Sequence, residues 1–166
     1  MTDTLGVLAA LLATVVMAPA VAHALELPGK LRLSRAEYTV VQRIYYPGFT
    51  RAGIAEIPGV LVAAAALAVT DAGTADFVLR SVALAALSGV QAVYWLRVHP
   101  ANRIWLEEQD LDRLSTGFFA LASRHRPGGD ASYAAWATLR NRWESGHVLR
   151  AALATIAVTS LVVALA

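Results

Sequence analysis

The stretch that decides the fold is "TLGVLAALLATVVMAPAVAHALEL", residues 4–27. It carries no formal charge before Glu26, and most of its residues are apolar. A helix needs about 20 mostly apolar residues to cross the hydrocarbon of a bilayer. The stretch therefore predicts a membrane-spanning helix. Its end raises a question, because His23 and Glu26 are polar groups in a segment otherwise suited to lipid.

Three further stretches are long or apolar enough to span a bilayer, at residues 49–70, 77–98 and 146–166. The second is interrupted by Glu56 and Pro58. The whole chain is 57% hydrophobic and only 16% charged, whereas a soluble domain carries about 25% charged residues. The sequence predicts an all-α integral membrane four-helix bundle, one domain over residues 1–166, with short interfacial helices in its two longer loops.

Several function classes are excluded by what the sequence lacks. There is no cysteine, which excludes disulfides, thiolate metal ligands and cysteine redox chemistry. No Walker loop, nucleophile elbow or dinucleotide fingerprint occurs. "VAHA" at residues 21–24 is similar to a signal-peptidase site, but Asp3 stands where a secretory signal carries a cation. We therefore expect the first span to be retained.

The basic residues predict the orientation of the chain. With four spans, both termini lie on one side and both longer loops on the other. All 14 Lys and Arg residues except Arg80 fall in those loops or at their borders, and cationic loops remain in the cytoplasm. This predicts an inner-membrane protein with periplasmic termini and cytoplasmic loops. The basic loops are expected to contact anionic lipid headgroups and not nucleic acid.

Both loops contain helical patterns. Ser34 and Glu37 form a capping-box pattern, followed by Tyr38 and further apolar residues at helical spacing, which predicts an interfacial helix that ends at "YPGF" (46–49). In the second loop an apolar stripe over residues 111–121 is broken by "RPGGD" (126–130). Asp130 or Ser132 would then cap a helix that runs into the fourth span. The four tryptophans are expected to be interface anchors, at Trp95, Trp105, Trp136 and Trp143.

The topology places two acid–imidazole pairs at one depth. His23 precedes Glu26 in the first span, and Glu144 precedes His147 in the fourth, which runs the other way. Each pair therefore puts its histidine about 4.5 Å deeper than its glutamate. Residues three apart share a helix face, so both pairs are expected to converge on one point at the cytoplasmic end of the bundle.

Other polar residues approach the same end. Glu56 lies near the start of the second span, unless Pro58 marks a helix start and leaves Glu56 in a cap. Gln91, Tyr94 and His99 lie at the end of the third span. The remaining histidine, His125, has arginine on both sides, which is typical of a solvated surface.

Three interpretations of this cluster stay open. Intramembrane ionisable residues cost about 2.5–3.5 kcal/mol each on insertion scales and are functional candidates by default. Glu and His from several helices suit non-haem iron, manganese or zinc, with His23, Glu26, Glu56, His99, Glu144 and His147 as the candidate ligands. Two imidazoles on facing helices suit haem. Without a cofactor, the carboxylates could pair with Arg32, Arg142 or Arg150 in a structural network.

Several motifs at the loop borders resemble a known family. They are "AHALELPGKLRLSRAEYTVVQRIYYPGF" (22–49), "HPAN" (99–102) and "WATLRNRWESGHVLR" (136–150). They are similar to small bacterial four-span membrane proteins whose better-known members are called anthrone oxygenases. The resemblance covers most of the chain, and its most specific positions include the His23–Glu26 and Glu144–His147 pairs. Residues 111–129 look like an insertion relative to that family.

The resemblance implies a four-helix membrane bundle that oxidises an anthrone to an anthraquinone. Under this hypothesis the protein is an oxygenase or oxidoreductase acting on a lipophilic aromatic substrate that enters from the lipid. The candidate catalytic residues come from the polar cluster and not from the resemblance: they are His23, Glu26, Glu144 and His147, with Gln91 or Tyr94 expected to orient the substrate oxygen. In a version without a cofactor, one histidine removes a proton from carbon and the carbanion reacts with oxygen.

Other classes of function compete with an enzyme. A bound haem or metal would make the protein an electron carrier, and a purely structural polar cluster would make it a membrane scaffold. A transporter would have to be a homo-oligomer, because four helices form a narrow bundle. The expected partners in every case are the bilayer and, for the enzyme, a lipophilic small molecule.

Overall fold

A computed structural model describes the backbone of residues 2–106 and 133–166, and the side chains of residues 3–42, 51–102 and 136–166. All regular secondary structure in these ranges is helical. The helices, in chain order, are α1 (Thr2–Lys30), α2 (Arg35–Gly53), α3 (Glu56–Ala68), α4 (Ala75–Val93), the π-helix η1 (Tyr94–Val98), α5 (His99–Leu106) and α7 (Tyr133–Val163).

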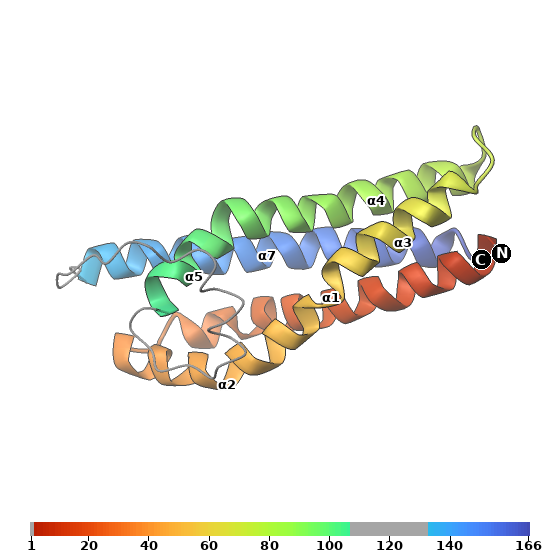
Figure 1. Cartoon of the computed structure of the whole chain (residues 1–166). Helices are drawn as coiled ribbons and strands as arrows, with labels where there is room; N and C mark the ends of the chain where they lie inside the picture. The colour runs from red at the N-terminus through yellow and green to blue at the C-terminus, as the bar shows by residue number, and fades with distance from the viewer. Residues whose placement is uncertain (1, 107–132) are drawn as a thin grey trace.

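Four of these helices form the bundle. α1 packs against α3 and α7, and α4 packs against the same two helices, so the four close into a ring. Figure 1 shows both termini and the α3–α4 turn at one end, with α2, α5 and the start of α7 at the other. The predicted all-α four-helix architecture is confirmed, including the placement of both termini at the same end.

Four helical segments are long and apolar enough to cross a membrane: Asp3–Lys30, Arg51–Ala68, Ala75–Asn102 and Trp136–Val163. They match the predicted spans at residues 4–27, 49–70, 77–98 and 146–166. The fourth differs most, because α7 continues without a break from the preceding loop segment through Trp136 and Trp143. The helix predicted to run into the fourth span is thus confirmed, while Asp130, Ser132 and the apolar stripe at 111–121 lie outside the described residues.

Small residues hold the bundle together. The main core cluster takes alanines from all four helices, together with Leu87 and Leu161. Small side chains allow helix backbones to approach closely, which is how helices associate where lipid removes the hydrophobic driving force. A Cβ on Gly89 would lie 3.2 Å from Leu153 Cδ1. The close packing predicted from Gly89 and the alanine-rich faces is therefore confirmed.

The outer surface of the bundle is apolar. Leu11 is 60% exposed and Leu61 64% exposed, with Val78 and Val162 also more than half exposed. The core is small and the surface carries the large aliphatic side chains, the reverse of a protein folded in water. This distribution fits helices surrounded by lipid.

Helix α2 follows the sequence prediction at its start but not at its end. Ser34 and Glu37 form the expected capping box. The helix continues through Pro47 to Gly53, so the predicted end at "YPGF" is wrong. A proline inside a helix removes one backbone hydrogen bond and often bends the helix without ending it. The break comes instead at residues 54–55, before Glu56 begins α3 and Pro58 occupies its first turn, where its missing N–H costs nothing.

A π-helical turn joins α4 to α5. η1 (Tyr94–Val98) widens the helix by about one residue per turn, a feature that is frequent at functional sites. α7 packs directly on it, because a Cβ on Gly146 would lie 2.9 Å from Val98 Cγ2. The contact brings Tyr94 and the polar residues of α7 to the same end of the bundle.

Candidate functional site

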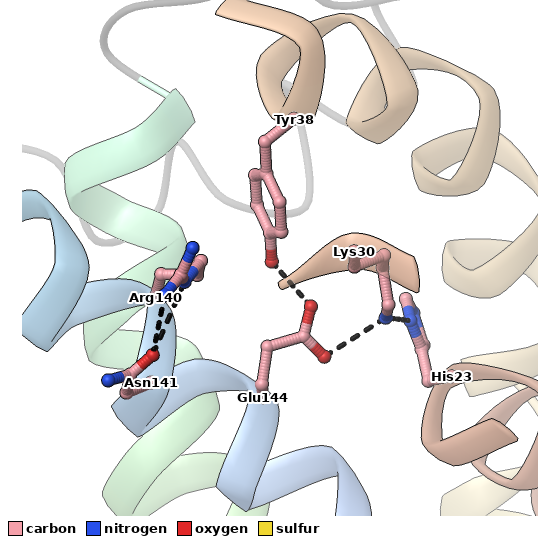
Figure 2. A network of polar contacts seen from close by, with 6 residues as sticks. All are labelled: His23, Lys30, Tyr38, Arg140, Asn141 and Glu144. Carbon is pink, nitrogen blue, oxygen red and sulfur yellow. Dashed lines mark hydrogen bonds and ion pairs between the residues drawn. The ribbon is translucent and has the colours of Figure 1, made fainter. Parts of the chain in front are cut away.

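A buried chain of polar contacts connects α2, α7 and α1 (Figure 2). The Tyr38 hydroxyl donates to Glu144 Oε1 at 2.6 Å, and Lys30 Nζ lies 3.0 Å from Glu144 Oε2. Lys30 Nζ also lies 2.9 Å from His23 Nδ1. Arg140 and Asn141, drawn in the same view, bond to each other at 3.2 Å. Tyr38, Glu144, Lys30 and His23 thus form one continuous network across three helices.

The network is almost completely removed from solvent and lipid. The exposed fractions are 1% for Tyr38, 2% for Glu144 and His23, and 3% for Lys30. An isolated buried charge is very costly, whereas a paired and hydrogen-bonded one is tolerated. Glu144 receives two donors and Lys30 has both an acid and an imidazole beside it, which is the condition for keeping the pair ionised inside the bundle.

The rings of the two histidines lie against each other at a tilt. The ring centroids of His23 and His147 lie 4.4 Å apart, with 36° between the ring planes. Trp143 packs against both rings, with centroids 4.2 Å from His147 and 5.1 Å from His23. The Trp143 indole is itself held by a 2.7 Å hydrogen bond from Nε1 to Asn102 Oδ1. The aromatic contacts therefore fix the position of both imidazoles.

His147 differs from His23 in its hydrogen bonding. The residue is only 7% exposed. Within the described ranges neither of its ring nitrogens has a hydrogen-bond partner. Buried polar atoms without partners are uncommon in native proteins and often mark catalytic groups or the site of a ligand or water.

A second ion pair lies on α7 about one turn beyond His147. Arg150 contacts Glu56 Oε1 through its Nη2 atom, and Gln91 Nε2 donates to Glu56 Oε2 at 2.6 Å. The Arg150 guanidinium also lies over the Tyr94 ring, 5.4 Å from its centroid. The arginine is thereby held between α3 and η1.

A small cavity joins the two polar groups. It has a volume of about 30 Å³, enough for one or two water-sized groups. Its polar lining consists of His23, His147, Glu56 and Arg150. Its apolar walls come from α1 and from the α2–α3 junction, at Val16, Pro19, Ala20, Ala52 and Gly53. The His147 imidazole, which has no hydrogen-bond partner among the described residues, and the Arg150 guanidinium therefore face the same small cavity.

The predicted convergence holds for part of the predicted set. His23, Glu144 and His147 come together, and Glu56 lies on the same cavity. Glu26 is not among the cavity-lining residues, and its Oε2 is buried without a hydrogen-bond partner among the described residues. His99 packs on Trp95, with ring centroids 4.9 Å apart.

The described side chains do not assemble the predicted metal site. Across residues 2–106 and 133–166, no three His, Asp or Glu residues are grouped so that they could hold a metal ion. Glu144 is bonded to Lys30 and Tyr38, and Glu56 to Arg150 and Gln91. The carboxylates are held by protein donors in this arrangement, so the metal hypothesis gains no support from the geometry.

Two of the predicted interface anchors are in the core instead. Trp136 is 6% exposed and Trp143 is 3% exposed, so the interface prediction is wrong for both. Trp95, at 53% exposed, fits it, and the side chain of Trp105 lies outside the described residues. Tyr38, taken from the pattern as part of an interfacial helix, is also buried. Each buried ring packs on the polar network. The position of a tryptophan near the end of a span does not show whether its ring points to the interface or into the bundle.

Lys30 and Arg150 are the members that the sequence interpretation placed poorly. Lys30 ends the first span seven residues after His23, a spacing that puts both on one helix face. Arg150 follows His147 by three residues, again on one face. The spacing rule that grouped the histidines with the glutamates also places Lys30 on the face of His23 and Arg150 on the face of His147. The sequence therefore contained the signal for both cations.

Comparison of this chain with protein-family models, with curated proteins and with solved structures finds no match. The arrangement of the site is therefore interpreted from its own chemistry.

Proposed function

We propose that this protein is a membrane-embedded enzyme that removes a proton from a lipophilic carbonyl compound, with His147 as the base, and lets molecular oxygen oxidise the resulting carbanion. One observation carries the proposal. His147 is buried, has two ring nitrogens without hydrogen-bond partners among the described residues, and faces a cavity that Arg150 also lines. A base and a cation on one cavity suit removal of a proton from a carbon whose carbanion is conjugated with a carbonyl group.

The chemistry divides between these two side chains. A neutral imidazole takes the proton from the carbon, and the negative charge moves to the carbonyl oxygen, where the Arg150 guanidinium stabilises it. The carbanion then adds O₂, and the resulting peroxide anion takes the proton back from the His147 imidazolium to give a hydroperoxide. Loss of water from the hydroperoxide converts CH₂ to C=O, so one O₂ is consumed and one water is formed for each substrate.

The cavity volume limits how a substrate can bind. A space of about 30 Å³ is far smaller than the roughly 300–1,000 Å³ of a complete ligand pocket. Only the reacting edge of an aromatic molecule would enter it. The rest would lie along the apolar wall between α1 and the α2–α3 junction, where Ile54 is 73% exposed and Ile57 56% exposed. Entry from the lipid follows from this placement.

The resemblance to anthrone oxygenases supports the choice of substrate class. An anthrone is lipophilic and carries a CH₂ group whose proton is acidified through the ring by a carbonyl. It is therefore a suitable first probe for a site with one base and one oxyanion partner.

The test separates proton removal from oxidation. Purified protein in lipid nanodiscs is incubated with anthrone in deuterated buffer under argon, and deuterium entry into the CH₂ group is followed by mass spectrometry. Oxygen is then admitted, and its uptake and anthraquinone formation are measured. We expect exchange above the buffer background without oxygen, and equal consumption of O₂ and formation of anthraquinone with it.

Two variants sharpen the result. His147→Gln keeps a polar side chain of similar size but is not a base, so exchange should fall to the buffer background. His99→Gln is the matched control, because His99 is not among the cavity-lining residues, and it should leave exchange unchanged. A wild-type protein that exchanges no deuterium, or a His147→Gln protein that exchanges it normally, contradicts the proposal.

A structural role is the second candidate, favoured by the completeness of the Tyr38–Glu144–Lys30–His23 network. A network of this kind can fix how α1, α2 and α7 pack. In that case His147→Gln would lower thermal stability as much as substitutions in the network do, and the protein would show no exchange.

A further inference from the structure

The two histidines of the cavity are in different chemical situations, and the difference begins at Lys30. Lys30 Nζ lies 3.0 Å from Glu144 Oε2, with both side chains almost fully buried. Glu144 Oε1 accepts the Tyr38 hydroxyl at 2.6 Å. Because both carboxyl oxygens act as acceptors, Glu144 is a carboxylate and Lys30 is its ammonium partner.

An ammonium group has three N–H donors and no acceptor. The 2.9 Å contact between Lys30 Nζ and His23 Nδ1 can therefore exist only if Nδ1 carries no proton and accepts. The single proton of the neutral ring must then be on Nε2. The hydrogen bond made by one ring nitrogen sets the protonation of the other in this way throughout proteins.

We infer that Lys30 is a positioning residue that holds His23 as its Nε2–H tautomer, so that His23 donates a hydrogen bond to the oxygen of the substrate while His147 alone accepts the proton. The catalytic half of this inference rests on the proposed function. The tautomer half does not, because it follows from the Lys30–Glu144–His23 contacts.

The division assigns different roles to two imidazoles whose ring centroids lie 4.4 Å apart. His23 lines the cavity, and with Nδ1 engaged by Lys30 the polar group that its ring offers is a donor. His147 has no comparable contact to fix a tautomer within the described residues, so one of its nitrogens keeps a lone pair. One ring supplies an N–H and the other a base.

The tautomer is measured by ¹⁵N solid-state NMR of protein labelled at histidine and reconstituted in bilayers, with His23→Phe identifying the His23 signals. We expect a protonated Nε2 and an unprotonated Nδ1. Lys30→Arg keeps a cationic donor and should preserve this pattern. Lys30→Met/Glu144→Gln removes the cation without leaving a buried charge, and an Nδ1–H population should then emerge. A proton on Nδ1 in the wild type, or an unchanged tautomer in the double variant, overturns the inference.

The donor role is tested by binding and not by turnover, with benzophenone as a lipophilic probe that presents a carbonyl oxygen but neither an acidic carbon nor a hydroxyl group. Loss of a hydrogen bond to a buried oxygen should weaken binding about tenfold, so His23→Phe should raise the Kd by that factor while His147→Gln leaves it unchanged. Equal losses in both variants overturn the division of roles. The wild type could show the Nε2–H tautomer of His23 and yet exchange no substrate deuterium. That result overturns the proposed function but leaves the role of Lys30 in setting the tautomer intact.

Discussion

Lys30, the last residue of α1, and Glu144, in α7, form an ion pair of 3.0 Å in which each side chain is less than 5% exposed. The pair joins the two helices that carry His23 and His147. Burial removes both charges from water, which is costly, and it also strengthens the attraction between them. The charges are therefore stable in the bundle only while they remain paired.

Removing one partner of this pair should destabilise the protein strongly. Lys30→Met leaves the Glu144 carboxylate buried with Tyr38 as its remaining donor among the described residues, and the expected loss is about 3–5 kcal/mol in free energy of unfolding. Lys30→Met/Glu144→Gln removes both charges and keeps an acceptor for Tyr38, so it should recover much of that loss. Equilibrium unfolding in bilayers measures both. A double variant as unstable as the sum of its single variants would contradict the coupling.

Gly146 should be required for the contact of α7 with η1. A Cβ there would lie 2.9 Å from Val98 Cγ2 and 3.5 Å from Arg97 Cβ. Val98 is buried, at 2% exposed, so a methyl group added at Gly146 overpacks this contact, and Gly146→Ala should cost about 1–3 kcal/mol. Gly29→Ala is the control, since a Cβ there meets nothing within 4 Å. Gly29→Ala should stabilise its helix by up to about 1 kcal/mol. Thermal unfolding should therefore show a raised melting temperature for Gly29→Ala and a lowered one for Gly146→Ala.

The four-helix architecture could be predicted because apolar length alone identifies a span, and the His–Glu spacing predicted part of the site. The rest could not be predicted for physical reasons. Which partner a buried acid takes depends on how far α1 extends past Leu27, and only the packed structure shows Lys30 reaching Glu144. The end of α2 was misplaced because Pro47 and Gly48 are local signals, whereas packing decides whether a helix tolerates them.

The capping box of α2 gives a pH-dependent prediction. The Ser34 hydroxyl lies 2.7 Å from Glu37 Oε2 and the Ser34 backbone N–H donates to the same atom at 2.8 Å. The hydroxyl contact, and after it the backbone bond, holds the pKa of Glu37 below its ordinary value. The resulting stabilisation is present above the ordinary pKa and is lost as pH falls through the lowered one.

Ser34→Ala should therefore raise the pKa of Glu37 towards its ordinary value, as followed by ¹³C NMR titration of the carboxyl group. Ser34→Thr keeps the hydroxyl and should keep the lowered pKa. The stability difference between wild type and Ser34→Ala should shrink as the pH falls and the carboxylate is protonated. A pKa of Glu37 that does not move in Ser34→Ala would show that the capping hydroxyl does not set it.

The orientation predicted from the basic loops can be tested directly, because the chain has no cysteine to give background labelling. Ala72 is exposed in the α3–α4 turn, at the end of the bundle that holds both termini, and Arg32 is exposed at the opposite end. If cationic loops face the cytoplasm, a membrane-impermeant maleimide should label Ala72→Cys in cells whose outer membrane alone is permeabilised. Arg32→Cys should be labelled only after the inner membrane is opened. The reverse pattern would place the His23–His147 cavity near the periplasmic surface and the basic loops outside the cytoplasm, against the charge rule. Labelling of both cysteines in cells with an intact inner membrane would contradict the crossing of the bilayer itself.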